Sequence, residues 1–474
     1  MKVVLVRPPF YALFGVKSPK MKTYPLNLLC LATYVRDQRS HAVTIVDGET
    51  LEVAGSPPLN DESDPSVAMH EGIRKMLEIM TDPDAPVWLE LERRILNENP
   101  EIVGITCNSG NMDTVKLLVK RLKPSRVPII LGGSHPTALP EQSIRYCDAD
   151  MVVMGEGELT LTAVLDCLDQ GKDVSAVPGL AWTSNGSVQV NPRGQLIRPL
   201  DNLPIPDRSF IDRSQYFGDV LMTGRGCPYS CTYCASRSIW GRTVRLRSVG
   251  GVIRELELLR TETERDTNTM RPGRWVVKIL DDTFTVNRTR TLALLDEIIA
   301  RGLNRFEFTG GIRADTLDET VARKLSAANF KRVTLGIESG SPRILSAIRK
   351  GQTNEDVKRT LRLLREVGIH SHAFFMIGLP GETPDDIALS KQLILDARPD
   401  SIEINMVTPY PGTELFPELV PENPLNIDRW YRWFHQGLAT HSDRLGYDLD
   451  TAYEDFAAFA KHYNETMAKG NHRP

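Results

Sequence analysis

The strongest constraint on the fold is a repeated alternation of short apolar strands with helices along most of the chain. In the first part of the sequence, strands are predicted at Lys2–Arg7, Ala42–Asp47, Ile102–Thr106, Ile129–Leu131 and Met151–Met154. Strands that are apolar throughout and separated by helices are typical of a parallel sheet covered on both faces. We therefore predict a Rossmann-like, doubly wound α/β domain, whose ligands bind beyond the C-terminal ends of its strands.

A second series of strands and helices begins near residue 220. Its strands are predicted at Val220–Thr223, Trp275–Leu280, Arg305–Phe308, Arg332–Leu335, His370–Met376 and Ser401–Asn405. Helices are expected between them, at 249–261, 289–300, 317–328, 354–367 and 384–397. Six parallel strands in succession favour a partial (β/α)6 barrel over the complete eightfold barrel.

These elements predict how the chain divides into domains. The predicted parts are a Rossmann-like domain over 1–191 with a helical insertion at 51–100, a proline-rich linker over 192–215, a barrel over 216–413 and a small helical region over 414–474. Within the insertion, Val67–Met80 and Val87–Leu96 are expected to be helical. Asn185-Gly186 predicts a tight hairpin turn. The aromatic residues from Trp430 to Phe434 are interpreted as core packing, with a pocket for a flat substrate as the alternative.

Composition limits the classes of function. The net charge of −4 lacks the basic excess of a broad nucleic-acid surface, so a nucleic-acid partner is not expected. No run approaches the ~18 consecutive apolar residues of a transmembrane helix. The sequence enters a strand directly after Met1, without the apolar core of a signal peptide. These features predict a cytoplasmic protein without a membrane span.

Three of the seven cysteines, Cys227, Cys231 and Cys234, form a C-x3-C-x2-C cluster. Three thiolates in a short loop are suited to three of the four irons of a 4Fe–4S cluster, which leaves one iron with an open coordination position. A structural zinc site would need a fourth ligand nearby, and none is close in sequence. A fortuitous cysteine loop is the other alternative. The remaining residues, Cys30, Cys107, Cys147 and Cys167, are single and are expected to be buried small side chains.

The cysteine motif resembles that of the radical S-adenosylmethionine (SAM) superfamily, in which an aromatic residue, here Tyr233, precedes the last cysteine. The resemblance extends from about residue 218 to residue 413. It includes the segments at the ends of the later strands, namely Ile279–Thr285, Gly310–Asp315, Gly336–Gly340, Phe375–Thr383 and Thr408–Thr413. These positions agree with a barrel, which collects functional groups at the C-terminal ends of its strands.

The resemblance implies cofactors and site residues. It implies that Cys227, Cys231 and Cys234 hold a 4Fe–4S cluster, and that SAM binds the open iron and is reductively cleaved. Tyr233, Asp281, Arg313 and Glu338 are the implied SAM contacts, with Arg313 suited to a carboxylate because of its planar fork. A structural, salt-bridged carboxylate is the alternative for each acid. An external electron donor such as flavodoxin or ferredoxin is expected.

Two glycine turns at strand ends distinguish the first domain. They are Gly132-Gly133-Ser134-His135 and Gly155-Glu156-Gly157-Glu158. Together with the barrel downstream, this order resembles the cobalamin-binding domain of cobalamin-dependent radical SAM enzymes, over about residues 1–170. The cobalamin contacts that the resemblance implies are Pro8, Thr106, Gly132, Gly133, His135, Gly155, Glu156 and Gly157.

Two alternatives concern this first domain. The D-x-H-x-x-G motif that supplies a histidine to cobalt in many cobalamin proteins is absent. His135 is therefore either a cobalt ligand or a hydrogen-bonding residue of the turn. Asp47 and Glu49 follow the second strand, where a dinucleotide-binding domain places its ribose-binding acid, but the G-x-G-x-x-G fingerprint is also absent.

The resemblance implies a cobalamin-dependent radical SAM methyltransferase. Such an enzyme would methylate an unactivated carbon of a small-molecule or natural-product substrate, through a 5′-deoxyadenosyl radical and methylcobalamin. One alternative keeps the cofactors for a non-methylating cyclisation, ring rearrangement or oxidation. Another is a non-enzymatic corrinoid and iron–sulfur protein. A methylthiotransferase is disfavoured, because the additional cysteines lie in a different domain context.

Overall fold

The fold is described from a computed structural model of residues 1–474. The structure describes residues 1–9, 24–39, 41–51, 78, 82–216, 218–265, 275–420, 423–427, 430 and 445–470. The predicted helix at Val67–Met80 lies outside this set, except for Glu78. Within the set, no helix is both long enough and apolar enough to cross a membrane.

The first part of the chain forms a seven-stranded sheet in the order β2-β1-β3-β4-β5-β6-β7. Its strands are β1 (Lys2–Arg7), β2 (Ala42–Asp47), β3 (Ile102–Thr106), β4 (Ile129–Gly132), β5 (Met151–Val153), β6 (Leu180–Ser184) and β7 (Ser187–Val190). The first five are parallel, and the hairpin β6–β7 adds two antiparallel strands. Asn185 and Gly186 both have positive φ angles, of 49° and 74°, as the predicted primed turn requires.

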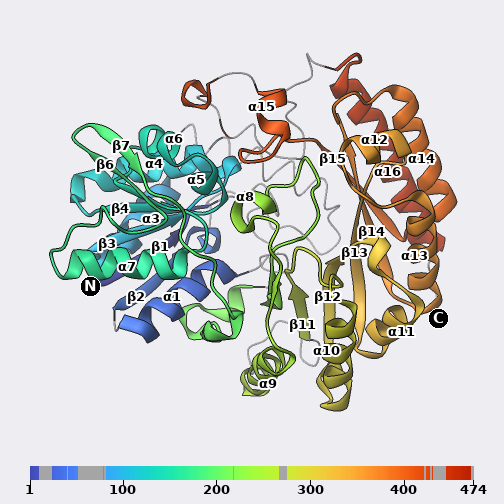
Figure 1. The fold of residues 1–474 in the computed structure, drawn as a ribbon, viewed down its shortest axis with the longest axis horizontal. Helices are drawn as coiled ribbons and strands as arrows, with labels where there is room; N and C mark the ends of the chain where they lie inside the picture. The colour runs from blue at the N-terminus through green and yellow to red at the C-terminus, as the bar shows by residue number, and fades with distance from the viewer. Residues whose placement is uncertain are drawn as a thin grey trace. The chain divides into compact units, whose positions relative to one another are not determined.

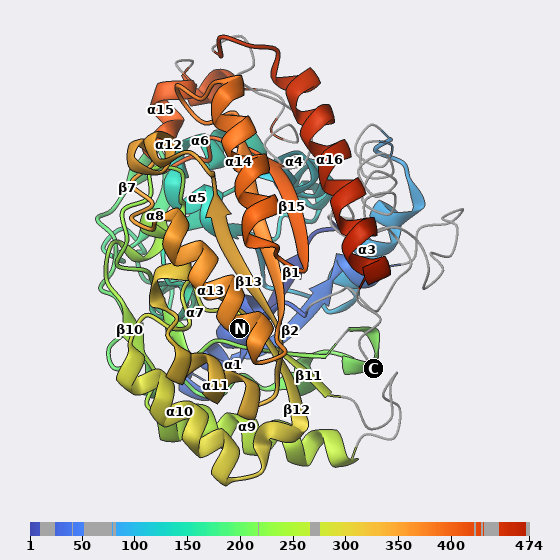
Figure 2. The ribbon, with the colours of Figure 1, turned by 90° about the vertical axis from the view of Figure 1, so that its right-hand side faces the viewer.

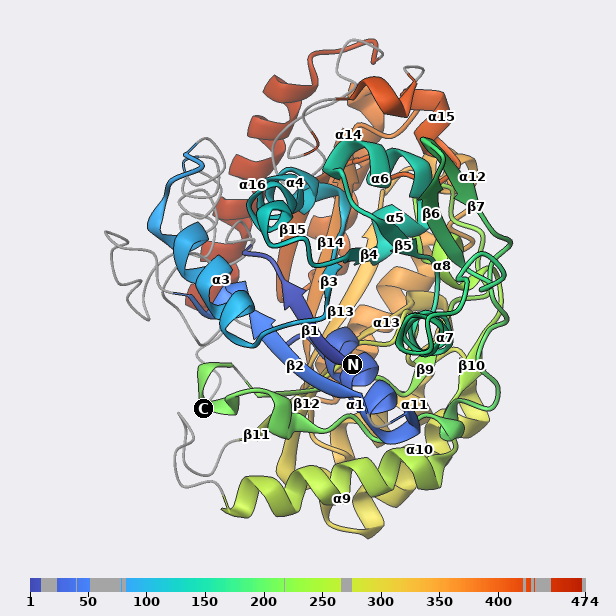
Figure 3. The same ribbon diagram turned by 90° about the vertical axis from the view of Figure 1, so that its left-hand side faces the viewer.

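Helices cover both faces of this sheet. They are α1 (Leu26–Arg39), α3 (Pro86–Asn97), α4 (Met112–Leu122), α5 (Ser134–Ala138), α6 (Pro140–Cys147) and α7 (Gly157–Asp169). α1 packs beside α7, whereas α4 packs beside α3 and α6 (Figure 3). The predicted doubly wound domain is therefore confirmed, and α3 confirms the helix expected at Val87–Leu96.

The second sheet has six parallel strands in the order β15-β14-β13-β12-β11-β8. They are β8 (Asp219–Leu221), β11 (Trp275–Ile279), β12 (Phe306–Ile312), β13 (Phe330–Glu338), β14 (His370–Ile377) and β15 (Ser401–Met406). The predicted partial barrel is confirmed. The short antiparallel pair β9 (Gly224–Arg225) and β10 (Arg245–Leu246) was not predicted, because two residues carry no alternation of side chains.

One face of the second sheet is covered by helices, as Figures 1 and 2 show. They are α9 (Val249–Arg265), α10 (Arg288–Ala300), α11 (Glu319–Ala327), α12 (Pro342–Ala347), α13 (Asn354–Glu366), α14 (Pro384–Ala397) and α16 (Leu449–Gly470). Two shorter helices, α8 (Ser236–Trp240) and α15 (Leu415–Leu419), follow β9 and β15 in the sequence. Alternate strand residues such as Val277, Phe308 and Val333 enter one apolar core with these helices. Thr383 and Asp386 form a capping box at the start of α14, with Pro384 in its first turn.

The outer edge of β15 is covered by a side chain. The Asn464 amide of α16 donates to the carbonyl oxygen of Ile402 at 2.9 Å and accepts from the Ile402 backbone N–H at 2.9 Å. Tyr463 donates its hydroxyl to the carbonyl oxygen of Pro399 at 2.7 Å. Asn464 therefore replaces, at one residue, the pairing that a further strand would supply.

The chain separates into two compact units. The first contains Met1–Arg198, Asn202–Phe217 and Glu422–Tyr431, and the second contains Pro199–Asp201, Gly218–Pro421 and Arg432–Pro474. Much of the segment predicted as a linker therefore belongs to the first unit, where Arg208 is buried. Trp430 also belongs to the first unit, although it follows the barrel in sequence.

Candidate functional site

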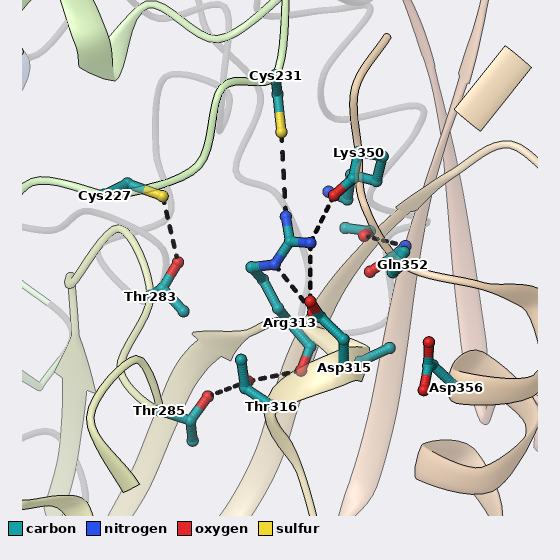
Figure 4. A network of polar contacts seen from close by, with 12 residues as sticks. Cys227, Cys231, Thr283, Thr285, Arg313, Asp315, Thr316, Lys350, Gln352 and Asp356 are labelled. Carbon is teal, nitrogen blue, oxygen red and sulfur yellow. Dashed lines mark hydrogen bonds and ion pairs between the residues drawn. The ribbon is translucent and has the colours of Figure 1, made fainter. Parts of the chain in front are cut away.

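The three clustered cysteines lie in one loop directly after β9. Figure 4 shows two of them, Cys227 and Cys231. All three thiols are free and half-buried. Gly226 precedes them with a φ of 93°, and a Cβ at this position would approach the Thr243 carbonyl oxygen to 2.1 Å. The loop is anchored beyond the barrel strands by the Thr232 backbone N–H, which donates to the Ile348 carbonyl oxygen at 3.1 Å. The backbone therefore holds three thiols in a defined, partly accessible loop.

The donor set fits a cubic cluster better than a single metal ion. Within the described residues, no group of three or more His, Cys, Asp or Glu side chains converges closely enough to hold one ion. A cubic cluster binds each thiolate to a different iron, so its ligands stand farther apart than those of zinc. Three free thiols without a fourth ligand therefore match the predicted 4Fe–4S cluster.

Two consecutive carboxylates after β11 hold the backbone that leads into the cysteine loop. Asp281 accepts from the Thr223 N–H at 2.6 Å and the Gly224 N–H at 3.3 Å, and it also accepts from the Thr223 hydroxyl. Asp282 accepts from the Gly226 N–H at 3.0 Å. Burial raises the pKa of Asp281 despite these donors. Asp281 was predicted to contact SAM, but its oxygens face the backbone that leads into the cysteine loop.

Replacing Asp281 with Ala is expected to lower the iron content of the reconstituted protein by more than half. The change leaves the N–H groups of Thr223 and Gly224 without their acceptor, at a cost of about 1–3 kcal/mol for each buried group. Iron analysis and the electron paramagnetic resonance (EPR) signal of the reduced cluster measure the effect. Glu297→Ala on the exposed surface of α10 is the control. An unchanged iron content and EPR signal in Asp281→Ala would contradict this positioning role.

Arg313 lies beside the cysteine loop at the end of β12. Its guanidinium donates to both oxygens of Asp315, at 2.9 and 3.1 Å, and to the Lys350 carbonyl oxygen at 2.5 Å. One nitrogen lies 3.9 Å from the Cys231 sulfur (Figure 4). The guanidinium also stacks over the Tyr229 ring, 3.6 Å from its centroid. Asp315 therefore holds the Arg313 guanidinium in a fixed orientation, and a carboxylate ligand would be the second carboxylate that this guanidinium binds.

Tyr233, Glu338 and Lys350 form a hydrogen-bonded cluster, in which Glu338 and Lys350 are buried and Tyr233 is half-buried. Lys350 donates to Glu338 at 2.8 Å and to the Tyr233 hydroxyl at 3.0 Å, and that hydroxyl donates to Glu338 at 2.9 Å. Glu338 has a φ of 72°, a left-handed conformation that is unfavourable for a residue with a Cβ. The structure thus joins two of the predicted SAM contacts, Tyr233 and Glu338, both directly and through a lysine that the sequence did not identify.

Three residues at this site were missed from the sequence. Asp282 and Thr283 belong to the segment Ile279–Thr285, so the motif was recognised but its second acid and hydroxyl were not singled out. Thr283 lies with its hydroxyl 3.7 Å from the Cys227 sulfur. Lys350 follows α12 in a loop, between Arg349 and Gly351, which have positive φ angles of 53° and 73°. Of these two neighbours, only the glycine is a signal that the sequence itself offers.

In the first unit, the predicted cobalamin contacts lie at the C-terminal ends of adjacent parallel strands. Pro8 follows β1, Thr106 ends β3, Gly132 ends β4 and Gly155 follows β5, and these strands are neighbours in the order β1-β3-β4-β5. The strand order changes direction at β1, with β2 on one side and β3 on the other, and ligands of open α/β sheets bind at such a point. The structure therefore gathers these residues along one edge.

The glycine turns are fixed by close backbone packing. Gly133 has a φ of 118°, and a Cβ there would meet the Cys107 carbonyl oxygen at 2.2 Å. Gly155 has a φ of 75° and donates its N–H to the Thr137 hydroxyl at 2.9 Å. At Gly157, a Cβ would approach a methyl group of Leu31 to 2.8 Å. Glu156 accepts from the Ile197 N–H at 2.8 Å.

Both ring nitrogens of His135 have hydrogen-bond partners. Nδ1 lies 2.9 Å from the Ser109 hydroxyl and Nε2 lies 2.9 Å from the Gln142 amide oxygen, so Nε2 carries the proton. The buried Trp430 ring packs edge-on against the imidazole, with 4.3 Å between centroids. Burial lowers the pKa of His135 to about 4, so the ring is neutral at physiological pH. This geometry favours the turn role of His135, and Trp430 is core packing; Tyr431 to Phe434 lie outside the described residues.

We expect His135 not to coordinate cobalt, because coordination would require one of these hydrogen bonds to break. The EPR spectrum of bound cob(II)alamin should lack splitting from a histidine nitrogen, both in the wild type and in His135→Gln. Ser175→Ala, at an exposed turn of the same unit, serves as the matched control. A nitrogen splitting that is present in the wild type and lost only in His135→Gln would assign His135 to cobalt instead.

A cavity of about 310 Å³ lies beside β2, between α3 and the segment Phe210–Tyr216. Asp47, the residue considered for a dinucleotide ribose, is among its lining residues. Its oxygens accept from the Arg7 guanidinium at 2.8 Å and from the Tyr216 hydroxyl at 2.5 Å. Because this carboxylate is already bound on both oxygens, the dinucleotide alternative gains no support.

Comparison with known proteins identifies both halves of the chain. The model of the radical SAM superfamily matches residues 221–394, and the model of the B12 binding domain matches residues 69–165. The uncharacterized methyltransferase PH0819 from Pyrococcus horikoshii is 31% identical over 446 residues, which cover 91% of this chain and 86% of that protein. The anaerobic magnesium-protoporphyrin IX monomethyl ester cyclase of Rubrivivax gelatinosus is 28% identical over 346 residues. The matched region covers 70% of this chain and 60% of the cyclase.

A solved structure shares the fold. The radical SAM methyltransferase TsrM from Kitasatospora setae, with cobalamin and a 4Fe–4S cluster bound, matches with a TM-score of 0.69 and 19% identity, covering 89% of this chain and 78% of TsrM. A second TsrM structure contains tryptophan as substrate and a SAM analogue. Both domain models and the extended similarity to PH0819 lead to one family. The chain belongs to the cobalamin-dependent radical SAM enzymes, which use a 4Fe–4S cluster, SAM and cobalamin, and it is an enzyme of methyl transfer.

Proposed function

We propose that this enzyme methylates an unactivated carbon of a small-molecule substrate. The observation that carries the proposal is the free three-cysteine loop beside Arg313 and the Glu338–Lys350 pair, in a chain that also contains a B12 binding domain. The TsrM structure with tryptophan supports a small molecule as the substrate class. When bound, the cofactors supply a 5′-deoxyadenosyl radical for hydrogen removal and a methyl group for transfer.

The residues of the chain position these groups. We propose that Cys227, Cys231 and Cys234 bind three irons, and that Arg313 orients the SAM carboxylate through its planar guanidinium. Tyr233 and Glu338 bind the polar groups of SAM, and Lys350 holds Glu338 in place. In the first unit, Pro8, Thr106, Gly132, Gly133, Gly155, Glu156 and Gly157 contact cobalamin, and His135 supports the turn between them. Asp281 acts through the cysteine loop.

Reductive cleavage of SAM consumes one electron, so an external donor must supply it. We propose a low-potential protein such as flavodoxin or ferredoxin, and a cytoplasmic location, where such donors and free thiols are kept reduced. Turnover should require either this donor or a chemical reductant. Full activity without any reductant would contradict the proposal.

The test uses the anaerobically reconstituted holoenzyme with SAM that carries a deuterated methyl group. A methyltransferase of this class should form S-adenosylhomocysteine, 5′-deoxyadenosine and a product that contains the labelled methyl group. The similarity to the cyclase favours a second candidate, in which the same cofactors drive a non-methylating reaction. That candidate predicts 5′-deoxyadenosine without a labelled product, and mass spectrometry of a metabolite extract distinguishes the two.

A further inference from the structure

The face of the barrel sheet that points away from its helices carries an unusual row of side chains. We call it the inner face, and it is the face opposite the apolar core of Val277, Phe308 and Val333. Lys278 of β11 pairs in register with Thr309, Thr309 with Arg332 of β13, and Arg332 with His370 of β14. Residues in register across parallel strands point to the same face, so these four side chains form one row.

Two cations in this row have no hydrogen-bond or ion-pair partner among the described residues. Lys278 and Arg332 make no hydrogen bond or ion pair in the part of the chain that the structure describes. Both side chains remain exposed, although most of the residues around them on their strands are buried. The surrounding protein desolvates both groups in part and lowers the pKa of each, and Arg332 also lowers the pKa of Lys278 and of His370. Two like charges thus share one face at a free-energy cost that a bound anion would remove.

The other titratable groups of the inner face are engaged or neutral. The two imidazoles, His370 and His372, lie 2.9 and 2.8 Å from the Ser401 hydroxyl. Glu403 lies 3.4 Å from His372 and attracts Arg332 from a distance. Glu307 also has a partner. Burial lowers the pKa of His370, which keeps it uncharged at neutral pH. Lys278 and Arg332 are therefore the charges that an incoming ligand can neutralise.

Above this row, the inner face carries uncharged side chains and two glycines toward the cofactor end. The next positions of β12, β13 and β14 are Gly311, Thr334 and His372, and Gly336 and Phe374 follow them on β13 and β14. At Gly336, a Cβ would approach the Glu338 carboxylate to 2.4 Å and the Lys350 ammonium to 3.0 Å. Arg332 and Glu338 are six residues apart on one strand, roughly 20 Å at 3.3 Å per residue. The inner face thus has a cationic end and an end beside the cysteine loop.

We propose that the substrate is an elongated small molecule with an anionic group, a carboxylate or a phosphate, and that Lys278 and Arg332 bind this group. The inference rests on the proposed function, because it places the substrate on the barrel's inner face. Arg332 offers paired N–H donors that match the oxygens of either anion, and Lys278 adds a point charge. The rest of the substrate would extend over Gly311, Thr334 and Gly336, with the carbon to be methylated toward Glu338.

The test measures binding to the holoenzyme by titration calorimetry, with four probes that share one ring: benzoate, phenyl phosphate, benzamide and benzylamine. Benzoate or phenyl phosphate is expected to bind, and whichever binds more tightly indicates the anion. Loss of one charge-assisted contact should weaken binding about tenfold in Lys278→Gln and in Arg332→Gln. Arg332→Lys should retain more affinity than Arg332→Gln. Arg323→Gln and Lys358→Gln remove matched charges from the outer helices and should leave binding unchanged.

Three results would overturn the inference. The first is that neither anion binds, and the second is that the wild type and both Gln variants bind the anions equally. The third is that benzamide or benzylamine binds the wild type as tightly as the anions do. Cluster and cobalamin absorbance verify that each variant remains a holoenzyme. The assay requires no turnover, so it is independent of the proposed reaction. Failure to form S-adenosylhomocysteine or a labelled product would contradict the proposed function, even if the anions bind.

Discussion

Replacement of Cys227, Cys231 or Cys234 by Ala is expected to abolish formation of 5′-deoxyadenosine, with activity at least ~1000-fold below the wild type. Three thiolates are the minimum that holds the cluster while leaving one iron for SAM, and no fourth ligand in the loop can substitute. Cobalamin binding should persist, because its predicted contacts belong to the other unit. Iron analysis, cobalamin absorbance and chromatographic detection of 5′-deoxyadenosine measure the three quantities.

The matched control for these variants is Cys167→Ala, which removes a half-buried free thiol from α7 in the first unit. It should retain iron, cobalamin and activity. Loss of cobalamin together with the cluster in the three loop variants would mean that the two units do not bind their cofactors independently. Retention of the cluster in any one of them would reject the assignment of that cysteine.

Replacement of Lys350 by Met is expected to destabilise the protein by about 3–5 kcal/mol, because it leaves the buried Glu338 carboxylate without its cation. The side chains of Glu338 and Lys350 are only 10% and 6% exposed. The same change removes the donor to Tyr233, so SAM affinity should fall as well. Chemical denaturation at constant cofactor content measures the first effect, and equilibrium binding of SAM measures the second.

A second variant separates charge imbalance from lost packing. Glu338→Gln combined with Lys350→Met removes both charges and should recover part of the stability, whereas SAM binding should remain weak. Lys358→Met on α13, whose ion pair with Asp396 is partly exposed, should change stability by less than about 1 kcal/mol. A loss in Lys350→Met no larger than in this control would show that the buried pair does not stabilise the site.

The sequence predicted the architecture well, because strands buried on both faces are apolar throughout. It underestimated β12 and β13, which were expected to end at Phe308 and Leu335 but extend to Ile312 and Glu338. Both extensions contain glycine, and in both the buried residues alternate with residues of the inner face. An open inner face can accept Gly311 or Gly336, so the strand continues where the apolar run has stopped.

The site was only partly predictable. The cysteines, Tyr233, Arg313 and Glu338 stand in motifs and lie around one loop, as expected from their positions after strands. Asp281 shows the limit of this reasoning, since a carboxylate at a strand end can face a ligand or a neighbouring backbone, and spacing does not distinguish the two. Lys350 was not assigned, because its partner Tyr233 lies 117 positions away in the sequence.

The side chain of Asn464 on the edge of β15 has a consequence for synthesis on the ribosome. The residues that it joins are 62 positions apart. At about 5–20 residues per second, β15 is made roughly 3–12 s before its cover. During that interval the strand presents unpaired N–H and carbonyl groups to other nascent chains. Slow translation between residues 406 and 464 should therefore increase misassembly, and chaperone demand should be greatest in this window.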